Sequence, residues 1–214
     1  MIIPLILIFK YRVWLIAPLC LALLLTKSLG GILSLFFGLT IYFCLRGNLK
    51  KRKLLFLLGL LIITVFVLIA RSSIQKQHLQ PAFSIMTRLG YWKDTWEMIK
   101  LSPLTGVGLG NFNLAESRYA HNSYLQLWAE MGILGIVLII LSMITVLKCA
   151  LKDFRKSSDK SQISALISAN AAFLVHNFVD FTFFLPETAF VWWIISGLII
   201  SKEKNERNHS HPNL

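Results

Sequence analysis

Long apolar runs separated by short basic segments are the feature that most constrains how this chain can fold. Runs of this kind are typical of helices that cross the ~30 Å hydrocarbon core of a bilayer, and the shorter ones span it by tilting or local thinning. The sequence is 56% apolar, with a mean hydropathy of +0.65. We therefore predict an all-α, polytopic membrane bundle of about six transmembrane helices. The expected spans are residues 13–25, 30–45, 54–70, 123–148, 163–175 and 188–200.

The basic residues set the expected orientation of these spans. Short loops rich in Lys and Arg stay in the cytoplasm. The loop at about 71–122 and the turn at 176–187 then lie on the outer face. Most of the 22 basic residues fall in four segments that we place inside, namely 10–12, 46–53, 148–160 and 202–207.

The net charge of +12 does not indicate nucleic-acid binding. The basic residues serve as topology determinants between apolar runs, and no basic and aromatic surface is left free for a nucleic acid. Cys20, Cys44 and Cys149 lie in or beside apolar runs, where a thiol acts as a small packing residue. Neither a disulfide framework nor a metal-spaced cluster follows from them.

We expect the chain to consist of three segments. Residues 1–12 are expected to be the last part of a helix or an interfacial anchor, because the first apolar run is too short to span. No cleavable signal peptide is expected there, since no basic region precedes this run and no small-residue cleavage site follows it. Residues 13–201 form the membrane domain, and residues 202–214 form a polar cytoplasmic tail.

An amphipathic helix is expected over residues 83–99 of the outer loop. Its apolar stripe has spacings of three and four residues, and its tryptophans are of the type that sits at the headgroup level. We expect the helix to lie along the membrane surface or to pack across the mouth of the bundle. Arg88 lies on an adjoining face and suits a headgroup anchor and an anion ligand equally well. The stripe consists of Ile85, Leu89, Trp92, Trp96 and Ile99.

A glycine-rich loop, PLTGVGLGNF at 103–112, follows this helix. Its G-x-G-x-G spacing after a proline turn does not match the G-x-G-x-x-G of dinucleotide-binding folds. Two interpretations remain open. The glycines allow two elements to approach closely, which the residues alone favour, or their N–H groups form a nest for a phosphate.

His121 stands just before a helix that we expect to begin at Asn122 or Ser123 and to end at about Lys148. Ser123 and Gln126 have the capping-box spacing. Unpaired N–H groups at a helix N-terminus favour anions and disfavour imidazolium. His121 is therefore expected to stay neutral beside an anion site, as suits a general base. Taken alone, a membrane-proximal histidine is more often a structural hydrogen-bonding residue.

Three further ionisable residues are expected near this end of the bundle. Glu130 shares a helix face with Ser123 about two turns deeper, where a carboxylate should be paired or face a cavity. His176 and Asp180 are four residues apart and would share a helix face. A hydrogen bond between them is favoured over a metal site, because the sequence offers no third ligand.

Four groups of residues together resemble the O-antigen ligase and polymerase superfamily of bacterial inner-membrane glycosyltransferases. The resemblance covers about residues 13–200 and corresponds to the C-terminal half of typical members. An absent N-terminal half is therefore counted among the candidate partners. The motifs are R-x-x-x-W at 88–92, PLTGVGLGNF at 103–112, HNSYLQ at 121–126 followed by AEMGILG at 129–135, and HNFVDF at 176–181 with Pro186.

The resemblance implies transfer of a glycan from an undecaprenyl-diphosphate carrier to an acceptor hydroxyl of a glycolipid, glycan or protein, without cofactor or metal. By position, it implies His121 as the catalytic base and Arg88 as a ligand of the donor diphosphate. Members usually carry Ser-Arg-Gly where this chain has Ser28-Leu29-Gly30, so Lys27 is expected to replace that arginine. The remaining expected site residues are Gly106, Gly108, Gly110, Asn111 and Asn122 for substrate binding, and Glu130, His176 and Asp180 for support.

Several functions remain open within and outside this resemblance. Ligation to a lipopolysaccharide core, polymerisation of repeat units and O-glycosylation of a protein fit the sequence equally. A non-catalytic or truncated membrane subunit, which binds the lipid-linked glycan without turnover, is the alternative from another class, because Leu29 replaces the arginine. A transporter fits less well, since the spans lack paired Gly or Pro breaks and no inverted repeat is visible.

Overall fold

The regular elements that the structure describes are all helical, as the apolar patterning predicts. The computed structural model describes residues 2–8, 14–26, 28–47, 58–59, 62, 81–157 and 160–210. Lys27 lies outside these ranges. The expected span at 54–70 also lies outside them, apart from residues 58, 59 and 62. The elements are α1 (Ile2–Ile6), α2 (Ile16–Leu25), α3 (Leu29–Leu45), α5 (Pro81–Leu101), α6 (Ser123–Lys156), α7 (Lys160–His176), the 3-10 helix η2 (Thr182–Phe184) and α8 (Pro186–Ser210).

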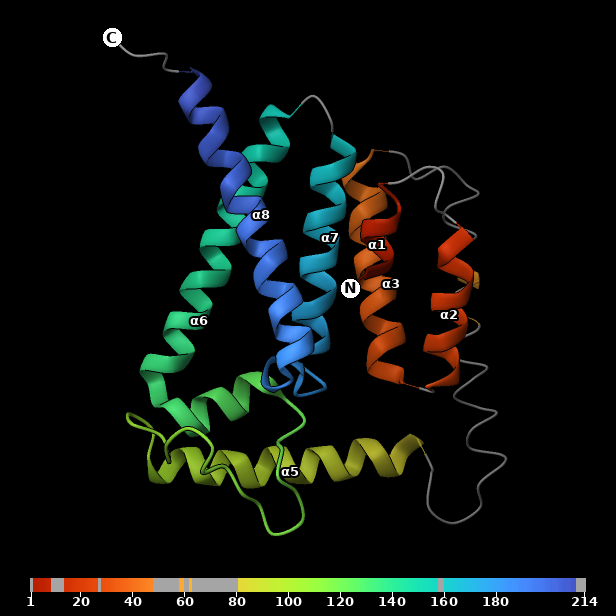
Figure 1. Cartoon of the computed structure of the whole chain (residues 1–214). Coiled ribbons are helices and arrows are strands. Elements are labelled where there is room, and N and C mark those ends of the chain that lie inside the picture. Colours follow the sequence, from red (N-terminus) through yellow and green to blue (C-terminus); the bar gives the residue numbers. More distant parts are fainter. Residues whose placement is uncertain are drawn as a thin grey trace.

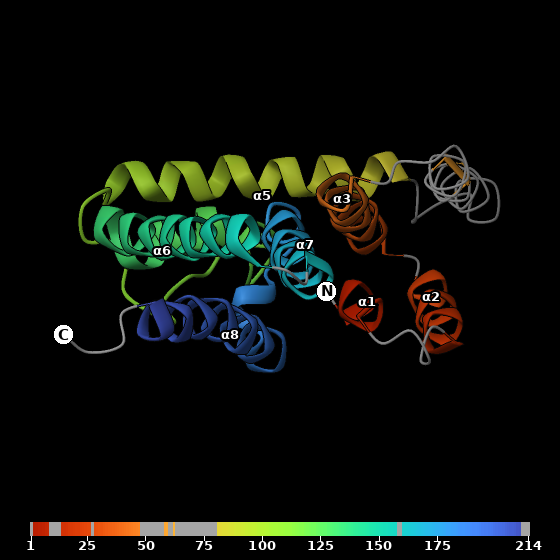
Figure 2. The ribbon, with the colours of Figure 1, turned by 90° about the horizontal axis from the view of Figure 1, so that it is seen from above.

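The helix α7 is the centre of the bundle. It contacts α1, α3, α6 and α8, and Figures 1 and 2 show it between them. Because protein surrounds it, α7 buries polar residues such as Ser164, Ser168 and Asn170 as well as apolar ones. The apolar core that α7 shares with α6 and α8 consists of Val146, Ala150, Ile163, Leu166, Ile167, Ala169, Ile195 and Ile199.

Among the described helices, α6 is long and apolar enough to cross a membrane, while α2, α3 and the first part of α8 are shorter apolar helices. Two helix ends differ from the sequence expectation. α6 continues past Lys148 to Lys156, and α8 continues through the segment expected to be a polar tail as far as Ser210. The added residues are mainly good helix formers, and neither extension contains Gly or Pro. The loss of apolar character therefore marks where a span ends and not where its helix ends.

The helix α1 packs inside the bundle. Its contacts are with α2, α3 and α7, and Ile3 and Ile6 are buried. It lies alongside α3, away from the end covered by α5 (Figure 1). Whether this segment is part of a helix or an interfacial anchor stays a prediction.

The helix α5 crosses one end of the bundle nearly at right angles to the other helices (Figure 1). Its predicted apolar stripe does not pack as one face, because Leu89 is 51% exposed and Trp96 is 43% exposed. The buried side is centred instead on Thr95 and Ile99, which are 0% and 2% exposed. This side faces the first turns of α6 and the glycine loop through an apolar cluster of Ile99, Phe112, Ala120 and Ala129.

The helix α6 is kinked at Gly132, whose φ is 65°. Residues before the kink run along α5, and residues after it run along the bundle (Figure 1). The glycine loop enters the kink: the N–H of Ile133 donates to Pro103 O at 3.0 Å, and the N–H of Val107 donates to Ala129 O at 2.8 Å. The loop thus supplies backbone partners where the helical ladder is interrupted.

The two ends of the bundle differ in chemistry. The N-termini of α3, α6 and α8 and the C-terminus of α7 gather beside α5, and the opposite helix ends gather at the far side (Figure 1). That far side carries Arg46 after α3, the basic residues of the last turns of α6, and Lys160 at the start of α7. This segregation agrees with the expected sidedness; which end faces the cytoplasm stays a prediction.

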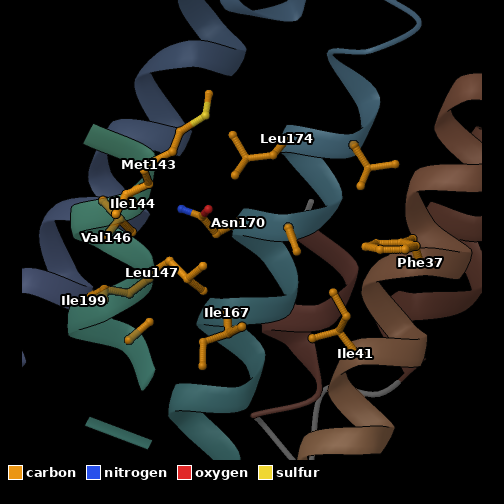
Figure 3. Close-up of a pocket in the computed structure, with 13 residues that line it drawn as sticks. Phe37, Ile41, Met143, Ile144, Val146, Leu147, Ile167, Asn170, Leu174 and Ile199 are labelled. Carbon is orange, nitrogen blue, oxygen red and sulfur yellow. The ribbon is translucent and has the colours of Figure 1, made fainter. Parts of the chain in front are cut away.

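A cavity of about 330 Å³ lies between α3, α6, α7 and α8 (Figure 3). Its lining is apolar except for Asn170, whose side-chain N–H donates to Ser196 Oγ at 3.1 Å. This hydrogen bond joins α7 to α8 beside the cavity. The residues expected to act on a substrate lie elsewhere, at the end that α5 covers.

Candidate functional site

His121 is fixed between α5 and the turn that follows α7. Its φ of 50° is a left-handed conformation, unusual for a residue other than glycine. The next residue, Asn122, caps α6 by accepting the N–H groups of Tyr124 at 3.0 Å and Leu125 at 3.2 Å. The cap is therefore Asn122, one residue before the serine of the predicted capping box, and the backbone reverses at His121 to present its ring to α5.

Two aromatic rings hold the imidazole of His121. The ring of Tyr91 on α5 stacks on it with centroids 6.0 Å apart, and the ring of Phe181 meets it edge-on at 5.2 Å. Phe181 in turn stacks face to face with Tyr119 at 4.0 Å. Rings on two sides leave the imidazole little freedom to turn, so its two nitrogens face fixed directions.

The Nδ1 atom of His121 faces Asp180. It lies 3.7 Å from Asp180 Oδ1, and it has no closer hydrogen-bond partner among the described residues. A carboxylate accepts hydrogen bonds, so the neutral ring is favoured with its proton on Nδ1. The Nε2 atom then keeps its lone pair, as a general base requires.

Asp180 is held in place by the start of α6. The N–H of Ser123 donates to the backbone oxygens of Asn177 at 2.9 Å and Asp180 at 3.0 Å. The hydroxyl of Ser123 donates to Asn177 Oδ1 at 2.5 Å, and the N–H of Phe181 donates to Asp180 Oδ1 at 2.9 Å. The predicted capping serine therefore joins α6 to the turn after α7, which fixes the carboxylate beside His121.

The second carboxylate oxygen of Asp180 contacts His176. Asp180 Oδ2 lies 3.3 Å from His176 Nε2. Burial raises the pKa of Asp180, but the neighbouring imidazoles of His121 and His176 and the hydrogen bond from the Phe181 N–H outweigh it and lower the pKa well below its ordinary value. Asp180 is therefore an ionised carboxylate between two imidazoles. The expected pairing of His176 with Asp180 is present, and His121 joins it.

Arg88 lies one helical turn before Tyr91 on α5 and is partly buried. Residues three apart occupy the same side of a helix. Arg88 is thus on the side of α5 that meets His121 through Tyr91. Its role as a diphosphate ligand stays a prediction.

Two of the three glycines in the loop direct their backbone N–H groups at α6, and the third bonds back to Ser102. The N–H of Gly108 donates to Glu130 O at 2.9 Å, and that of Gly110 donates to Glu130 Oε2 at 2.8 Å, while the N–H of Gly106 donates to Ser102 O at 3.0 Å. A Cβ at Gly106 would overlap the carbonyl of Glu130. The loop geometry therefore favours close approach of two elements over a phosphate nest; substrate binding by these glycines stays a prediction.

Glu130 is 3% exposed and paired. Besides Gly110, it accepts a hydrogen bond from Gln126 Nε2 at 2.9 Å, and Gln126 Oε1 accepts the N–H of Ala120 at 3.1 Å. Glu130 therefore ties the glycine loop to the first turns of α6 and, through Gln126, to the residue that precedes His121. This network is consistent with a supporting role.

The side chains of two predicted substrate-binding residues make structural hydrogen bonds. The side-chain N–H of Asn111 donates to Val107 O at 3.1 Å, and Asn122 Oδ1 caps α6. Contact of Asn111 and Asn122 with a substrate stays a prediction, as does the role of Lys27. Within the described ranges, no group of three or more His, Cys, Asp and Glu residues is arranged to hold a metal.

Sequence reasoning missed Ser34 on α3, whose Oγ lies 3.2 Å from His176 Nδ1. It also missed that Phe181 contacts His121 and that Ser123 bonds Asp180. Ser34 lies in a plain apolar run and carries no local signal, because the contact joins residues more than a hundred positions apart. For the contacts of Phe181 with His121 and of Ser123 with Asp180, the sequence does carry a signal, namely the aromatic and polar residues of HNFVDF.

Comparison with known proteins gives one match. A family described as O-Antigen ligase matches residues 14–140, which is more than half of the chain. The matched region runs from α2 into α6 and includes Arg88 and His121, whereas Asp180 and His176 lie beyond it. No curated protein and no solved structure matches.

Proposed function

Because the chain belongs to the O-antigen ligase family, we propose that it transfers a glycan from an undecaprenyl-diphosphate carrier to an acceptor hydroxyl at the outer face of the bacterial inner membrane. In this proposal the helices α2, α3, α6, α7 and α8 form a multi-pass bundle, and the end covered by α5 faces outward. The apolar character of α6 and the basic residues at the opposite end support this placement.

The observation that carries the proposal is the His121–Asp180 pair beside α5. With its proton on Nδ1 toward Asp180, His121 presents Nε2 as the base. Nε2 takes the proton of the acceptor hydroxyl while the hydroxyl oxygen bonds to the anomeric carbon of the donor. The bond from that carbon to the diphosphate breaks, and the electron pair leaves with the diphosphate. Asp180 stabilises the imidazolium that forms.

Cleavage of the bond to the donor diphosphate needs little catalytic assistance from the protein. A diphosphate is a good leaving group, so the site mainly aligns the reactants and neutralises developing negative charge. Arg88 suits this task because a guanidinium binds phosphate oxygens in a bidentate manner and keeps its charge. Arg88 lies on the side of α5 that carries Tyr91, whose ring stacks on His121, and this shared side supports the proposed role.

The test is transfer by the purified protein in proteoliposomes. The donor is an undecaprenyl-diphosphate-linked glycan, and the acceptor is presented as lipopolysaccharide core, as a second lipid-linked glycan or as a protein in separate reactions. We expect one acceptor to become glycosylated with release of one undecaprenyl diphosphate per transfer, and His121→Ala to stop the release. Saturable donor binding without product would support the alternative of a non-catalytic carrier-binding subunit.

A further inference from the structure

Tyr119 and Phe181 form a stacked pair of aromatic rings beside His121. The planes of the two rings differ by 4°, and their centroids are 4.0 Å apart. Phe181 also meets the ring of His121 edge-on, with centroids 5.2 Å apart. Tyr119 is therefore separated from the proposed base by the ring of Phe181.

One face of the Tyr119 ring is covered, and the other is open. Phe181 covers the first face, yet 38% of Tyr119 is exposed. The covered face cannot contribute to this exposure, so the exposed area lies on the opposite face and on the edge of the ring. The protein thus presents a flat aromatic surface that the contacts of the proposed base do not use.

The backbone around Tyr119 holds its ring in place. The hydroxyl of Ser117 donates to Tyr119 O at 2.7 Å and accepts the N–H of Tyr119 at 3.1 Å. The N–H of Leu114 donates to Ser117 O at 2.9 Å, which closes the loop before Tyr119. Aromatic pairs prefer offset or edge-to-face arrangements over a direct sandwich, so the attraction between the rings does not set this geometry by itself. A surface formed in advance binds its ligand without the entropic cost of ordering the side chain.

A pyranose ring is the ligand whose chemistry fits this face. One side of a pyranose carries polarised C–H groups, which pack on the electron-rich face of an aromatic ring, while its hydroxyls point outward. Glu116 and Arg118 are exposed charged residues of the loop that leads to Tyr119. A carboxylate and a guanidinium accept from and donate to hydroxyls, so this loop offers polar partners as well as a stacking surface.

The position of Tyr119 assigns it to the acceptor and not to the donor. In a direct displacement, the attacking hydroxyl and the leaving group lie on opposite sides of the sugar ring. Arg88, the proposed diphosphate ligand, is on the side of α5 that reaches His121 through Tyr91. Tyr119 reaches His121 through Phe181 instead. The contacts of the base thus separate a diphosphate side from the side on which Tyr119 lies.

We propose that the open face of Tyr119 binds a sugar of the acceptor glycan, next to the sugar whose hydroxyl reacts. This inference rests on the proposed function, and it narrows the acceptor to a carbohydrate, either a lipopolysaccharide core or a second lipid-linked glycan. Because Phe181 separates Tyr119 from His121, the stacked sugar is a neighbour of the reacting one. An acceptor that consists of the reacting sugar only does not reach Tyr119.

Acceptor kinetics test this assignment. The transfer assay compares a single sugar on a short alkyl chain with an oligosaccharide that has the same sugar at its reacting end. Tyr119→Leu keeps an apolar contact with Phe181 but removes the flat face. For the oligosaccharide we expect KM to rise about three- to tenfold with kcat little changed, because a stacking contact contributes on this scale. For the single sugar, both constants should be unchanged.

Two further variants separate stacking from other roles. Tyr119→Phe keeps the ring and should keep the wild-type KM for the oligosaccharide. Phe190→Leu removes an aromatic ring that is 66% exposed in the first turns of α8, near the same end of the bundle, and should leave both acceptors unaffected. A membrane-anchoring role of Tyr119 predicts that Tyr119→Leu and Phe190→Leu affect both acceptors alike, and this result would overturn the proposal.

Binding without turnover distinguishes the possible failures. Core oligosaccharide freed from lipid A and repeat-unit oligosaccharide freed from its carrier are titrated separately into protein labelled with 13C at its tyrosine rings. We expect one of them to shift the signals of Tyr119, assigned by Tyr119→Phe, in a saturable manner. Shifted signals with an inactive wild type would refute the proposed function but not this inference. An active wild type whose Tyr119 signals respond to neither oligosaccharide, or whose only acceptor is a protein, would refute this inference but not the proposed function. If Tyr119→Leu fails to fold, this measurement on the wild type still decides.

Discussion

At the scale of single residues, the site depends on a few contacts that join distant parts of the chain. His121 is positioned by Tyr91 from α5 and by Phe181 and Asp180 from the turn after α7. Each contact restricts either the ring's orientation or its protonation. Loss of the base or of the diphosphate ligand should therefore affect chemistry far more than folding.

We expect His121→Ala and Arg88→Ala each to reduce glycan transfer by ~10²–10⁴-fold, since a general base and a charged ligand of the leaving group contribute on this scale. Membrane insertion should be unchanged.

The matched control is Lys93→Ala, a basic residue exposed on the same helix as Arg88, which should retain full activity. The assay is run with a chelator present. Full activity of His121→Ala would remove the base assignment, and loss of wild-type activity on chelation would indicate a metal near His176 and Asp180.

The ionised state of Asp180 predicts a dependence of stability on acid. The pKa of Asp180 is lower in the folded protein than its ordinary value of 3.8. The unfolded chain therefore binds a proton more readily than the folded one. The resulting contribution to the free energy of unfolding is full above about pH 4 and is lost as the pH falls further. Asp180→Asn should lose this part of the acid dependence, measured as the unfolding temperature between pH 7 and pH 3. Equal acid slopes for the two proteins would contradict the pairing.

At the scale of elements, the kink of α6 and the glycine loop form one unit. Gly106 and Gly132 both have positive φ, and each approaches the backbone of the other element too closely for a side chain. The kink turns the first part of α6 toward α5 and so brings His121 to its partners. Without it, a straight α6 would carry its N-terminus away from Tyr91.

Gly132→Ala tests this unit. Gly132 has φ 65° and ψ −167°, a region that is essentially restricted to glycine, so alanine there is strained by ~1–3 kcal/mol, and its Cβ would overlap the carbonyl of Leu104. We expect a lower unfolding temperature and loss of transfer activity. Gly197→Ala is the matched control, because a Cβ there meets nothing within 4 Å and alanine is the better helix former by up to ~1 kcal/mol. Equal stability of the two variants would show that the kink is not required.

The same elements show what could be predicted from the sequence. Apolar runs gave the positions of α2, α3, α7 and α8, and periodicity gave α5, because both signals are local. The exposed side of α5 and the kink at Gly132 were not predicted, since each depends on which element packs opposite. The contact between Ser34 and His176 likewise has no local signal. His121 and Asp180 were both selected, but nothing in their spacing predicted that they would face each other.

At the scale of the whole molecule, the chain separates its charges along the bundle. The basic residues after α3 and in the last turns of α6 lie at one end, and the site residues lie at the other, beside α5 (Figure 1). Lipid-linked glycans are presented at the outer face in the proposed reaction. The mechanism therefore requires that the α5 end face outward and the basic end face the cytoplasm.

Cysteine labelling from outside intact cells tests this orientation. In a background in which Cys20, Cys44 and Cys149 are replaced, single cysteines are placed at Arg118, in the loop before His121, and at Lys156, in the last turn of α6. Both positions are exposed, so accessibility does not favour either one. Because short positive segments stay in the cytoplasm, we expect an impermeant reagent to label position 118 and to reach position 156 only after the membrane is opened. Labelling of 156 but not 118 in intact cells would reverse the orientation, and it would place His121 on the side where the proposed reaction does not occur.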